Sequence, residues 1–323
     1  MDLTILDEIG PWEWPENAKQ AIKDALGDRT RSVDERSTAA NYAGEVVVMD
    51  DEMAGLLLAI ITSPDEVDRL RARAAIALGP TLQQCDEDGF GEFPYSEELI
   101  SQETYNRIRE ALQSVFNDKS NPSMVRRRAL EAAVRAPADW HADAIRQAYA
   151  MKDGDWKQTA VFCMGYVRGF DQEILQALES RYDDMKFEAI RAAGSAEIES
   201  AWPLIRDILE NPKTDRSNIL AAIEASGSLC PRDDSDVIYE LTESDDEEIA
   251  EAAEEALTFI NIDDSDFGDD DDSDDDTEPE SGDLEDDADE DEDDADGDFE
   301  EEDLEDGADD ADDSADKAPK KRP

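Results

Sequence analysis

The sequence offers few side chains that could catalyse a reaction or bind a metal. Its 323 residues contain one histidine, His141, and three widely separated cysteines, Cys85, Cys163 and Cys230. Zinc sites need clusters of His and Cys that one histidine cannot supply, and no Gly-x-Ser-x-Gly motif accompanies His141 for a Ser-His-Asp arrangement. We therefore expect no catalytic residues, no metal and no cofactor, and we expect the cysteines to be reduced thiols.

The segment APADWHADAI, residues 136–145, surrounds this histidine. It predicts a turn after Pro137 that leads into a helix. Trp140 would pack at the start of this helix, and His141 would be its partly exposed neighbour. We favour this structural role over a catalytic one.

An acidic insertion, CDEDGFGEFPYSEELIS at 85–101, could hold a calcium ion. Oxygen ligands and a glycine stand at positions 1, 3, 6 and 12 of a calcium-binding loop: Asp86, Asp88, Gly91 and Glu97. Position 5, however, is Phe90, which has no side-chain oxygen, and Pro94 interrupts the loop. We favour a solvated acidic loop, which can still contact a partner.

The segment VRRRALEAAVR, residues 125–135, places three arginines together in an otherwise acidic chain. Successive helical positions lie about 100° apart, so Arg126, Arg127 and Arg128 cannot share one face. We expect them to pair with acidic neighbours on adjacent repeats. The functional alternative is a basic spot that docks the acidic tail or an acidic partner.

Charge divides the chain into two parts. The net charge is −59, and residues 263–323 hold 35 acidic and 4 basic residues, which leaves 54 and 26 for residues 1–262. The two parts therefore carry −31 and −28. So dense a block of like charge predicts a disordered tail. An acidic body would repel phosphates, so we expect no direct binding of nucleic acid.

Neither the N-terminus nor the longest apolar run predicts secretion or membrane insertion. MDLTILDEIG lacks a basic region followed by an apolar stretch. The run Met53–Ile61 has nine residues, about half of the ~18 that suggest a membrane helix, and predicts a buried helix. The terminal KAPKKRP is either a nuclear localisation element or a basic end that offsets the acidic block, and we favour the second. We expect a soluble, cytoplasmic protein that does not bind membranes.

A repeat positions all of these residues. AIRAAGS at 189–195 returns nearly unchanged as AIEASGS at 222–228. The same Ala-x4-Gly frame, or its alanine alone, recurs at intervals of 35, 55, 31, 29, 33 and 31 residues: Ala39, Ala74, Ala129, Ala160, Ala189, Ala222 and Ala253. The positions four before and four after are mostly apolar, which marks one stripe of a helix. We call these the alanine helices, because the central alanine lets neighbouring helices approach closely.

Second helical stretches, such as MAGLLLAII, YNRIREALQSVF and WPLIRDIL, lie between the alanine helices. We call them the second helices. A helix pair every ~31 residues cannot bury its apolar faces alone and must stack on its neighbours. No segment shows sustained alternation of period two. The sequence therefore predicts an all-α protein, an α-solenoid of about seven helix pairs.

Two segments, EVDRLRARAAIALG (66–79) and MKFEAIRAAG (185–194), resemble the first helices of HEAT-like repeats. The resemblance is to the short type named after phycobilisome lyases, and it covers roughly residues 31–262. It implies a HEAT-like solenoid at 31–262, interrupted by the 85–101 loop. Residues 1–30 would form an N-terminal helical cap.

HEAT-like families include enzymes, and the residues argue against two of them. Deoxyhypusine hydroxylases hold two irons through several His-Glu pairs, whereas His141 is followed by Ala142. DNA glycosylases of HEAT-like fold need a positive concave surface, which a body of charge −28 does not offer. A bilin lyase or isomerase is suggested only by the family name, and it would need a tetrapyrrole pocket.

We expect a non-enzymatic, monomeric scaffold or adaptor that binds a protein partner, which could be basic. It would use the concave ridge of second helices and the 85–101 loop. The tail would keep the chain soluble or attract basic partners, and a chaperone of basic proteins is the alternative. The candidate partner-binding residues are Tyr105, Arg109, Arg127, Arg128, Trp140, His141, Arg146, Trp156 and Arg206.

Overall fold

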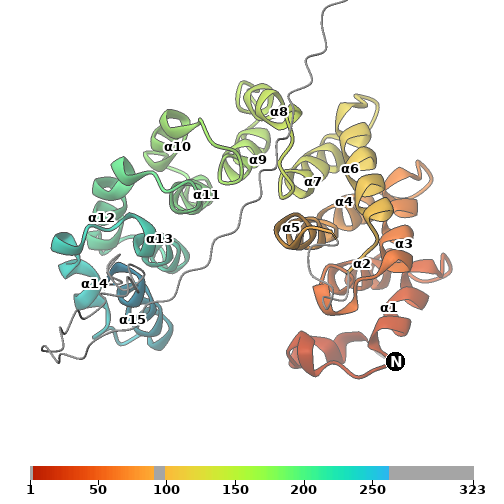
Figure 1. Ribbon diagram of the computed structural model, residues 1–323, viewed down its shortest axis with the longest axis horizontal. Coiled ribbons are helices and arrows are strands. Elements are labelled where there is room, and N and C mark those ends of the chain that lie inside the picture. Colours follow the sequence, from red (N-terminus) through yellow and green to blue (C-terminus); the bar gives the residue numbers. More distant parts are fainter. Residues whose placement is uncertain (1–2, 91–98, 262–323) are drawn as a thin grey trace, which may run out of the picture. The chain divides into compact units, whose positions relative to one another are not determined.

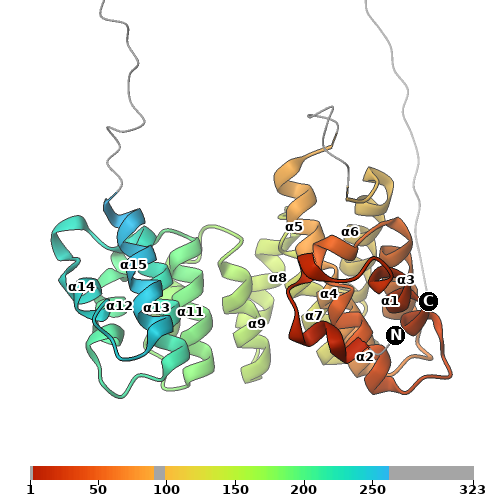
Figure 2. The same ribbon diagram turned by 90° about the horizontal axis from the view of Figure 1, so that it is seen from below.

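The computed structural model describes residues 3–90 and 99–261. These residues lie within one compact unit, which Figures 1 and 2 show from two directions. Every regular element in the described residues is a helix, so the predicted all-α class is confirmed. None of these helices combines the length and the apolar character that crossing a bilayer requires. The tail at 263–323, predicted to be disordered, lies outside the described residues.

Seven helices carry the recurring alanines, as predicted, and all seven alanines have 0% of their surface exposed. A residue with so small a side chain brings the backbones of adjacent helices into contact. The alanine helices are α2 (Val33–Tyr42), α4 (Asp68–Ala77), α7 (Ser123–Ala133), α9 (Gly154–Met164), α11 (Asp183–Ser195), α13 (Arg216–Leu229) and α15 (Glu247–Asn261).

The remaining helices include every predicted second helix. The second helices are α3 (Asp51–Thr62), α6 (Gln102–Asn117), α8 (Trp140–Tyr149), α10 (Asp171–Leu178), α12 (Trp202–Glu210) and α14 (Asp236–Leu241). Two further α-helices are α1 (Ala18–Gly27) and α5 (Gly79–Asp88). Short 3-10 turns lie at Leu3–Glu8, Pro11–Glu13, Val46–Val48, Glu199–Ala201 and Arg232–Asp234.

Among the other helices, each alanine helix packs mainly against the one that precedes it. Helix α1 packs on α2, α3 on α4, α6 on α7, and the series continues to α14 on α15. The described residues therefore hold seven pairs, and these begin with α1, one helix earlier than the sequence register predicts. The alanine helices also contact one another in chain order, from α2 and α4 to α13 and α15. Figure 2 shows α11, α13 and α15 side by side. This arrangement is a HEAT-type α-solenoid.

A recurring arginine links the two helices within each of the first three pairs. It stands three residues before the frame alanine, and its Nε donates to the carbonyl of the penultimate residue of the partner helix. The bonds are Arg36 to Leu26 at 3.1 Å, Arg71 to Ile61 at 2.9 Å and Arg126 to Phe116 at 2.8 Å. The last carbonyls of a helix have no partner within the helix, so each bond satisfies one of them.

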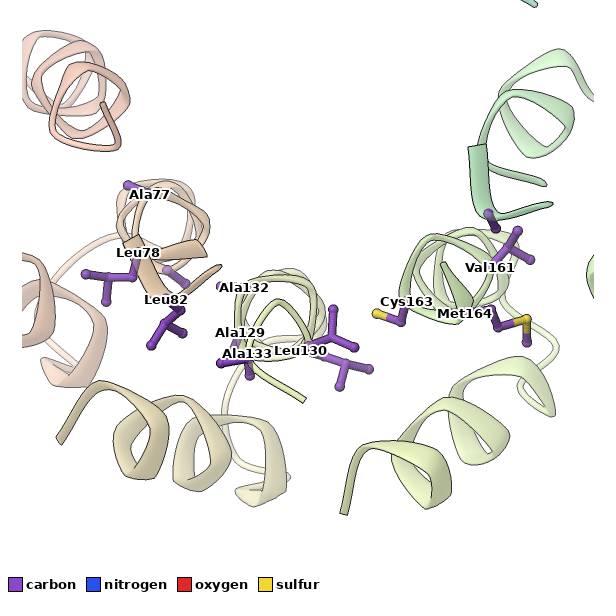
Figure 3. Packing of buried hydrophobic residues seen from close by; sticks show 14 of the residues in the cluster. Ala77, Leu78, Leu82, Ala129, Leu130, Ala132, Ala133, Val161, Cys163 and Met164 are labelled. Atoms are coloured by element: carbon purple, nitrogen blue, oxygen red, sulfur yellow. The ribbon is translucent and has the colours of Figure 1, made fainter. Parts of the chain in front are cut away.

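The alanine helices, and not the second helices, lie on the inner side of the curve. Figure 1 shows α7, α9, α11 and α13 inside, with α8, α10 and α12 outside. The prediction of a concave ridge of second helices is therefore wrong. Small residues explain the curvature, because they bring the alanine helices close: a Cβ built on Gly194 would lie 3.0 Å from Cα of Ala225, and one on Gly165 would lie 3.3 Å from Cα of Ala192. Figure 3 shows the small buried side chains along this layer, including Ala132 and Cys163.

The insertion between the second and third pairs is partly helical. The sequence predicts a loop over 85–101, but α5 extends to Asp88, so its first four residues are helical. Pro80 stands in the first turn of α5, where a proline needs no hydrogen-bond donor and favours a new helix. Residues 91–98 lie outside the described residues.

Candidate functional site

The inner layer contains a pocket of about 240 Å³ between α7, α9 and α11. Helix α9 supplies uncharged residues, Gln158, Thr159 and Phe162. Charged residues come from either side: Arg127, Arg128, Glu131 and Arg135 from α7 and the turn after it, and Glu188 and Arg191 from α11. Four guanidinium groups and two carboxylates thus converge on one pocket of a strongly acidic chain.

Arg135 is held in place by several contacts. Its Nη1 donates to Oε1 of Gln83 at 2.9 Å, and its guanidinium lies 5.8 Å from the ring centre of Phe162 and 5.5 Å from that of Tyr166. Gly79 leaves room for it, since a Cβ at that position would lie 2.8 Å from Cδ of Arg135. The buried Nε has no hydrogen-bond partner within the described residues.

Glu131 is the buried acid of the pocket, with 5% of its surface exposed. Its Oε1 accepts a hydrogen bond from Oγ1 of Thr159 at 2.6 Å, and its Oε2 is paired with Arg128 on the same helix. Both oxygens are therefore satisfied. The negative charge is compensated inside the pocket.

Glu188 and Arg191 line the other side. Burial raises the pKa of Glu188, and the negative charge of Glu131 adds to this effect, while Arg191 opposes it. The side chain of Arg191 is exposed, and its guanidinium lies 5.8 Å from the ring centre of Phe187. Within residues 3–90 and 99–261, no ion pair joins Arg135 or Arg191 to a carboxylate.

A second pocket of about 150 Å³ adjoins the first, because Arg191 lines both. Its other residues come from α11 and α13, and they are small except for Glu224: Gly194, Ser195, Ala221, Ala225 and Ser228. We call the two pockets together the alanine-helix groove. It runs along three consecutive steps of the solenoid, with charged groups at one end and small residues at the other.

A larger depression of about 690 Å³ is lined by residues of α8, α9, α10 and α11 and of the turns between them. Two tyrosines and two lysines dominate it: Tyr149, Tyr182, Lys152 and Lys157. Lys157 lies 5.8 Å from the ring centre of Tyr149, and Tyr182 is 60% exposed. Lysines on flexible stems bind less selectively than arginines that are already held in place.

The predicted residues Tyr105 and Arg109 lie together on α6. Tyr105 is buried, donates from its hydroxyl to Oδ1 of Asp86 at 2.7 Å, and contacts the ring of Phe90. The guanidinium of Arg109 lies 5.3 Å from the centre of the Tyr105 ring. Burial and the charge of Asp86 raise the pKa of Tyr105. These contacts fasten α5 to α6, which is a structural role.

His141 is buried, with 1% of its surface exposed, so the expectation of a partly exposed histidine is wrong. Its Nδ1 accepts the backbone N–H of Ala138 at 2.9 Å, which places the ring under the turn before α8. Burial, with a smaller effect of Arg109, lowers the pKa of His141 to about 4. Trp140 packs at the helix start as predicted, against Phe116.

The predicted Trp156 is buried in the same aromatic cluster. Its ring lies 6.3 Å from that of Phe116, and Arg126 lies 5.3 Å from its centre. Trp156 is therefore part of the core between α6 and α9 and is not available to a partner.

The arginines of VRRRALEAAVR separate as their spacing requires. Arg127 pairs with Asp155 of the next pair at 2.8 Å, so the predicted pairing across repeats is confirmed for this residue. Arg128 pairs within α7, and Arg126 bonds the preceding helix. Arg127 and Arg128 are the two predicted candidates that the structure places in the groove.

Arg146 and Arg206 lie on second helices, outside the groove. Arg146 pairs with Asp143 at 3.0 Å. Arg206 binds both carboxylate oxygens of Asp236 in the following pair, at 2.8 and 2.9 Å, and also pairs with Asp234. The Arg206 pairs link successive repeats, whereas the Arg146 pair lies within α8.

The calcium-loop interpretation gains no support from the described part of the insertion. Asp86 and Asp88 belong to α5, and Asp86 accepts the Tyr105 hydroxyl. Gly91 and Glu97 lie outside the described residues. No group of three or more His, Cys, Asp or Glu side chains with metal-binding geometry occurs in residues 3–90 and 99–261.

The sequence analysis missed Arg135, Glu188 and Arg191 as site residues. For Glu188 and Arg191, a signal was available in their offsets from the frame alanine. Arg128 and Glu188 stand one residue before it, Glu131 and Arg191 two residues after it. Equal offsets on successive alanine helices place side chains on the same face of the solenoid, so these charges could have been aligned from the repeat alone.

No family model matches the chain, and no curated protein sequence matches it. Among solved structures it is similar to YibA of Escherichia coli, with 16% identity, a TM-score of 0.41, and coverage of 77% of this chain and 83% of that chain. It is also similar to human deoxyhypusine hydroxylase in complex with glycerol, with 16% identity, a TM-score of 0.37, and coverage of 80% and 88%. A third similar structure is an engineered protein, with 16% identity, a TM-score of 0.32, and coverage of 77% and 92%. Because the identities are 16% and the TM-scores are 0.41 or lower, these similarities carry no argument here. The solenoid fold is assigned from the helix contacts of this chain.

Proposed function

We propose that the chain is a non-enzymatic scaffold that binds a protein partner along the alanine-helix groove. The observation that carries this proposal is the pocket between α7, α9 and α11, where four arginines converge in a chain of net charge −59. Arginines collected on a surface that otherwise repels anions provide a distinct recognition point. The short HEAT-like type remains our proposal for the repeat class.

The groove has side chains that are available to a partner. Arg191, Glu224 and Ser228 are exposed, and the adjoining small residues leave room for a chain segment. By contrast, Tyr105, His141 and Trp156 are buried, and Arg206 is already paired. We therefore propose that the partner binds the alanine helices, and not the second helices as the sequence analysis predicted.

We also propose that the chain is not an enzyme, and this proposal rests on the sequence. His141 is the sole histidine, and the contact of its Nδ1 with the Ala138 N–H commits one ring nitrogen to structure. We further propose a monomeric cytoplasmic protein whose acidic segment at 263–323 maintains solubility.

Partner capture followed by quantitative binding tests the proposal. A partner is isolated from native lysate with the full chain, identified, and titrated against variants. Arg191→Glu reverses a charge in the groove, and Lys157→Glu makes the same change of charge in the 690 Å³ depression. We expect Arg191→Glu to weaken binding by about tenfold or more, and Lys157→Glu and deletion of 263–323 to have less than about a threefold effect.

Other outcomes assign the function elsewhere. Loss of binding on deletion of 263–323, with steep weakening by salt, would make the acidic segment the binding element. Loss with Lys157→Glu but not with Arg191→Glu would place the partner in the larger depression. Either result would contradict the groove as the site.

A further inference from the structure

The four arginines of the groove are not equivalent. Arg127 and Arg128 are neutralised by carboxylates, Asp155 and Glu131. Arg135 and Arg191 have no such partner within the described residues. The pocket therefore contains two guanidinium groups whose charge is compensated only at a distance.

The carboxylates in the pocket leave this positive charge largely intact. Glu131 is engaged by both Thr159 and Arg128. Glu188 lines the pocket beside Gln158, and burial raises the pKa of its carboxyl, so its negative form is disfavoured. Neither acid forms an ion pair with Arg135 or Arg191.

Arg135 has the geometry of a prepared binding group. Phe162 and Tyr166 hold the plane of its guanidinium, Gln83 fixes one nitrogen, and Gly79 leaves space for the stem. A side chain that is already fixed loses little conformational entropy when a ligand binds. Its buried Nε still lacks an acceptor in the described residues, and a buried donor without an acceptor costs stability unless a ligand or water supplies one.

We propose that the pocket between α7, α9 and α11 binds one oxyanion group, a carboxylate or a phosphate carried by an extended segment of the protein partner. Arg135 and Arg191 donate to the oxyanion from opposite sides. Planar guanidinium forks match the oxygen atoms of both groups. The segment continues over the small residues Gly194, Ala225 and Ser228 of the second pocket. This inference rests on the proposed function, since it specifies the partner's chemistry.

The volume of the pocket and the net charge of the chain both agree with the binding of a single oxyanion group. The pocket's volume of about 240 Å³ accommodates a phosphate or carboxylate with a few waters. The net charge of −59 disfavours a partner that is strongly acidic throughout. One oxyanion within an otherwise neutral or basic segment avoids this repulsion.

Isothermal titration of the full-length chain with inorganic phosphate, at constant ionic strength against chloride, tests the inference directly. We expect saturable binding to one site, weakened by about tenfold in both Arg135→Gln and Arg191→Gln. Arg69→Gln is the matched control, because it removes an exposed arginine of the alanine helix α4 that pairs with Asp34, and it should change affinity by less than about twofold.

Gly79→Ala gives a second test that alters no charge. The added methyl would displace Arg135, so phosphate binding should weaken even though every guanidinium remains. Thermal unfolding of each variant verifies that the solenoid is intact. Where Arg135→Gln fails to fold, Arg191→Gln and Gly79→Ala carry the test.

A peptide pair distinguishes the two sources of the oxyanion. Two peptides of the same sequence carry either phosphoserine or glutamate at one position, and an alanine version is the control. Binding of either acidic form, weakened by Arg135→Gln, supports the inference, and the tighter form identifies the group. Absence of binding of phosphate and of both acidic peptides overturns it. If Arg191→Glu still weakens the native partner in that case, the proposed function stands and only its chemistry is wrong.

Discussion

The Nδ1 atom of His141 accepts the backbone N–H of Ala138 at 2.9 Å, in a position where 1% of the residue is exposed. The bond needs a neutral nitrogen with a free lone pair, so protonation of the ring would break it. The only histidine of the chain is thus a structural acceptor that closes the turn before α8.

The buried His141 predicts a loss of stability in mild acid. Its pKa is about 4 in the folded chain against an ordinary value of 6.5. Between these values the unfolded chain binds a proton that the folded chain does not, so the free energy of unfolding falls as pH falls through this window. The full loss is about 3 kcal/mol.

The variant His141→Asn keeps a side-chain acceptor for Ala138 and removes the titration. Urea unfolding at about pH 7 and about pH 4.5 should show a smaller loss in this variant than in the wild type, by roughly 2 kcal/mol. Carboxylates titrate equally in both chains, so the difference isolates the histidine. Equal losses would show that the histidine is accessible to protons in the folded chain.

Two glycines of the repeated phrase predict opposite effects of alanine. A Cβ on Gly194 would lie 3.0 Å from Cα and Cβ of Ala225, whereas the nearest atom to one on Gly227 is Cβ of Phe259 at 3.5 Å. We expect Gly194→Ala to destabilise the chain by about 1–3 kcal/mol through overpacking. Gly227→Ala should stabilise it by up to about 1 kcal/mol, because alanine favours helix. Thermal unfolding of the two variants measures this order, and a stabilising Gly194→Ala would contradict the close approach of α11 and α13.

The alanine helices could be predicted because their spacing has one physical cause. Each pair must stack on the next, so a small residue returns wherever two backbones meet, as at Ala189 and Ala222. The pairing of helices could not be read in the same way. The repeat period gives the sequence distance between successive alanine helices. It does not say whether an alanine helix packs on the helix before it or on the helix after it. The contact between α1 and α2 shows that it is the helix before.

Helix α5 and the arginine pocket could not be predicted from the sequence, for two different reasons. Helix α5 has Pro80 in its first turn and ends in acidic residues, a composition that is equally typical of a loop. The arginine pocket depends on the stacking of α7, α9 and α11, because Arg135 and Arg191 are 56 residues apart. Buried and exposed arginines also look alike in a sequence, so their hydrogen bonds could not be assigned.

The three cysteines predict slow thiol chemistry in the folded chain. Cys85 and Cys163 are buried, and burial raises the pKa of the Cys163 thiol. Burial, with the charge of Asp234, also raises the pKa of Cys230 to about 12. Since the thiolate is the reactive form, a disulfide reagent at about pH 8 should label the native chain slowly and all three thiols rapidly in urea. Rapid labelling of one thiol in the native chain would show local opening around it.

Arg71 and Arg69, on the same helix α4, provide the last prediction. Arg71 is 6% exposed and donates to the Ile61 carbonyl at 2.9 Å and to Oδ1 of Asn121 at 2.6 Å. Its replacement by methionine leaves both acceptors unsatisfied next to the core, so Arg71→Met should lower the free energy of unfolding by about 2–4 kcal/mol. Arg69 forms an exposed pair with Asp34 at 2.9 Å, and Arg69→Met should cost less than about 1 kcal/mol. Urea unfolding of the full chain compares the two variants. Similar costs at both positions would mean that the arginine bonds between paired helices do not hold the solenoid together.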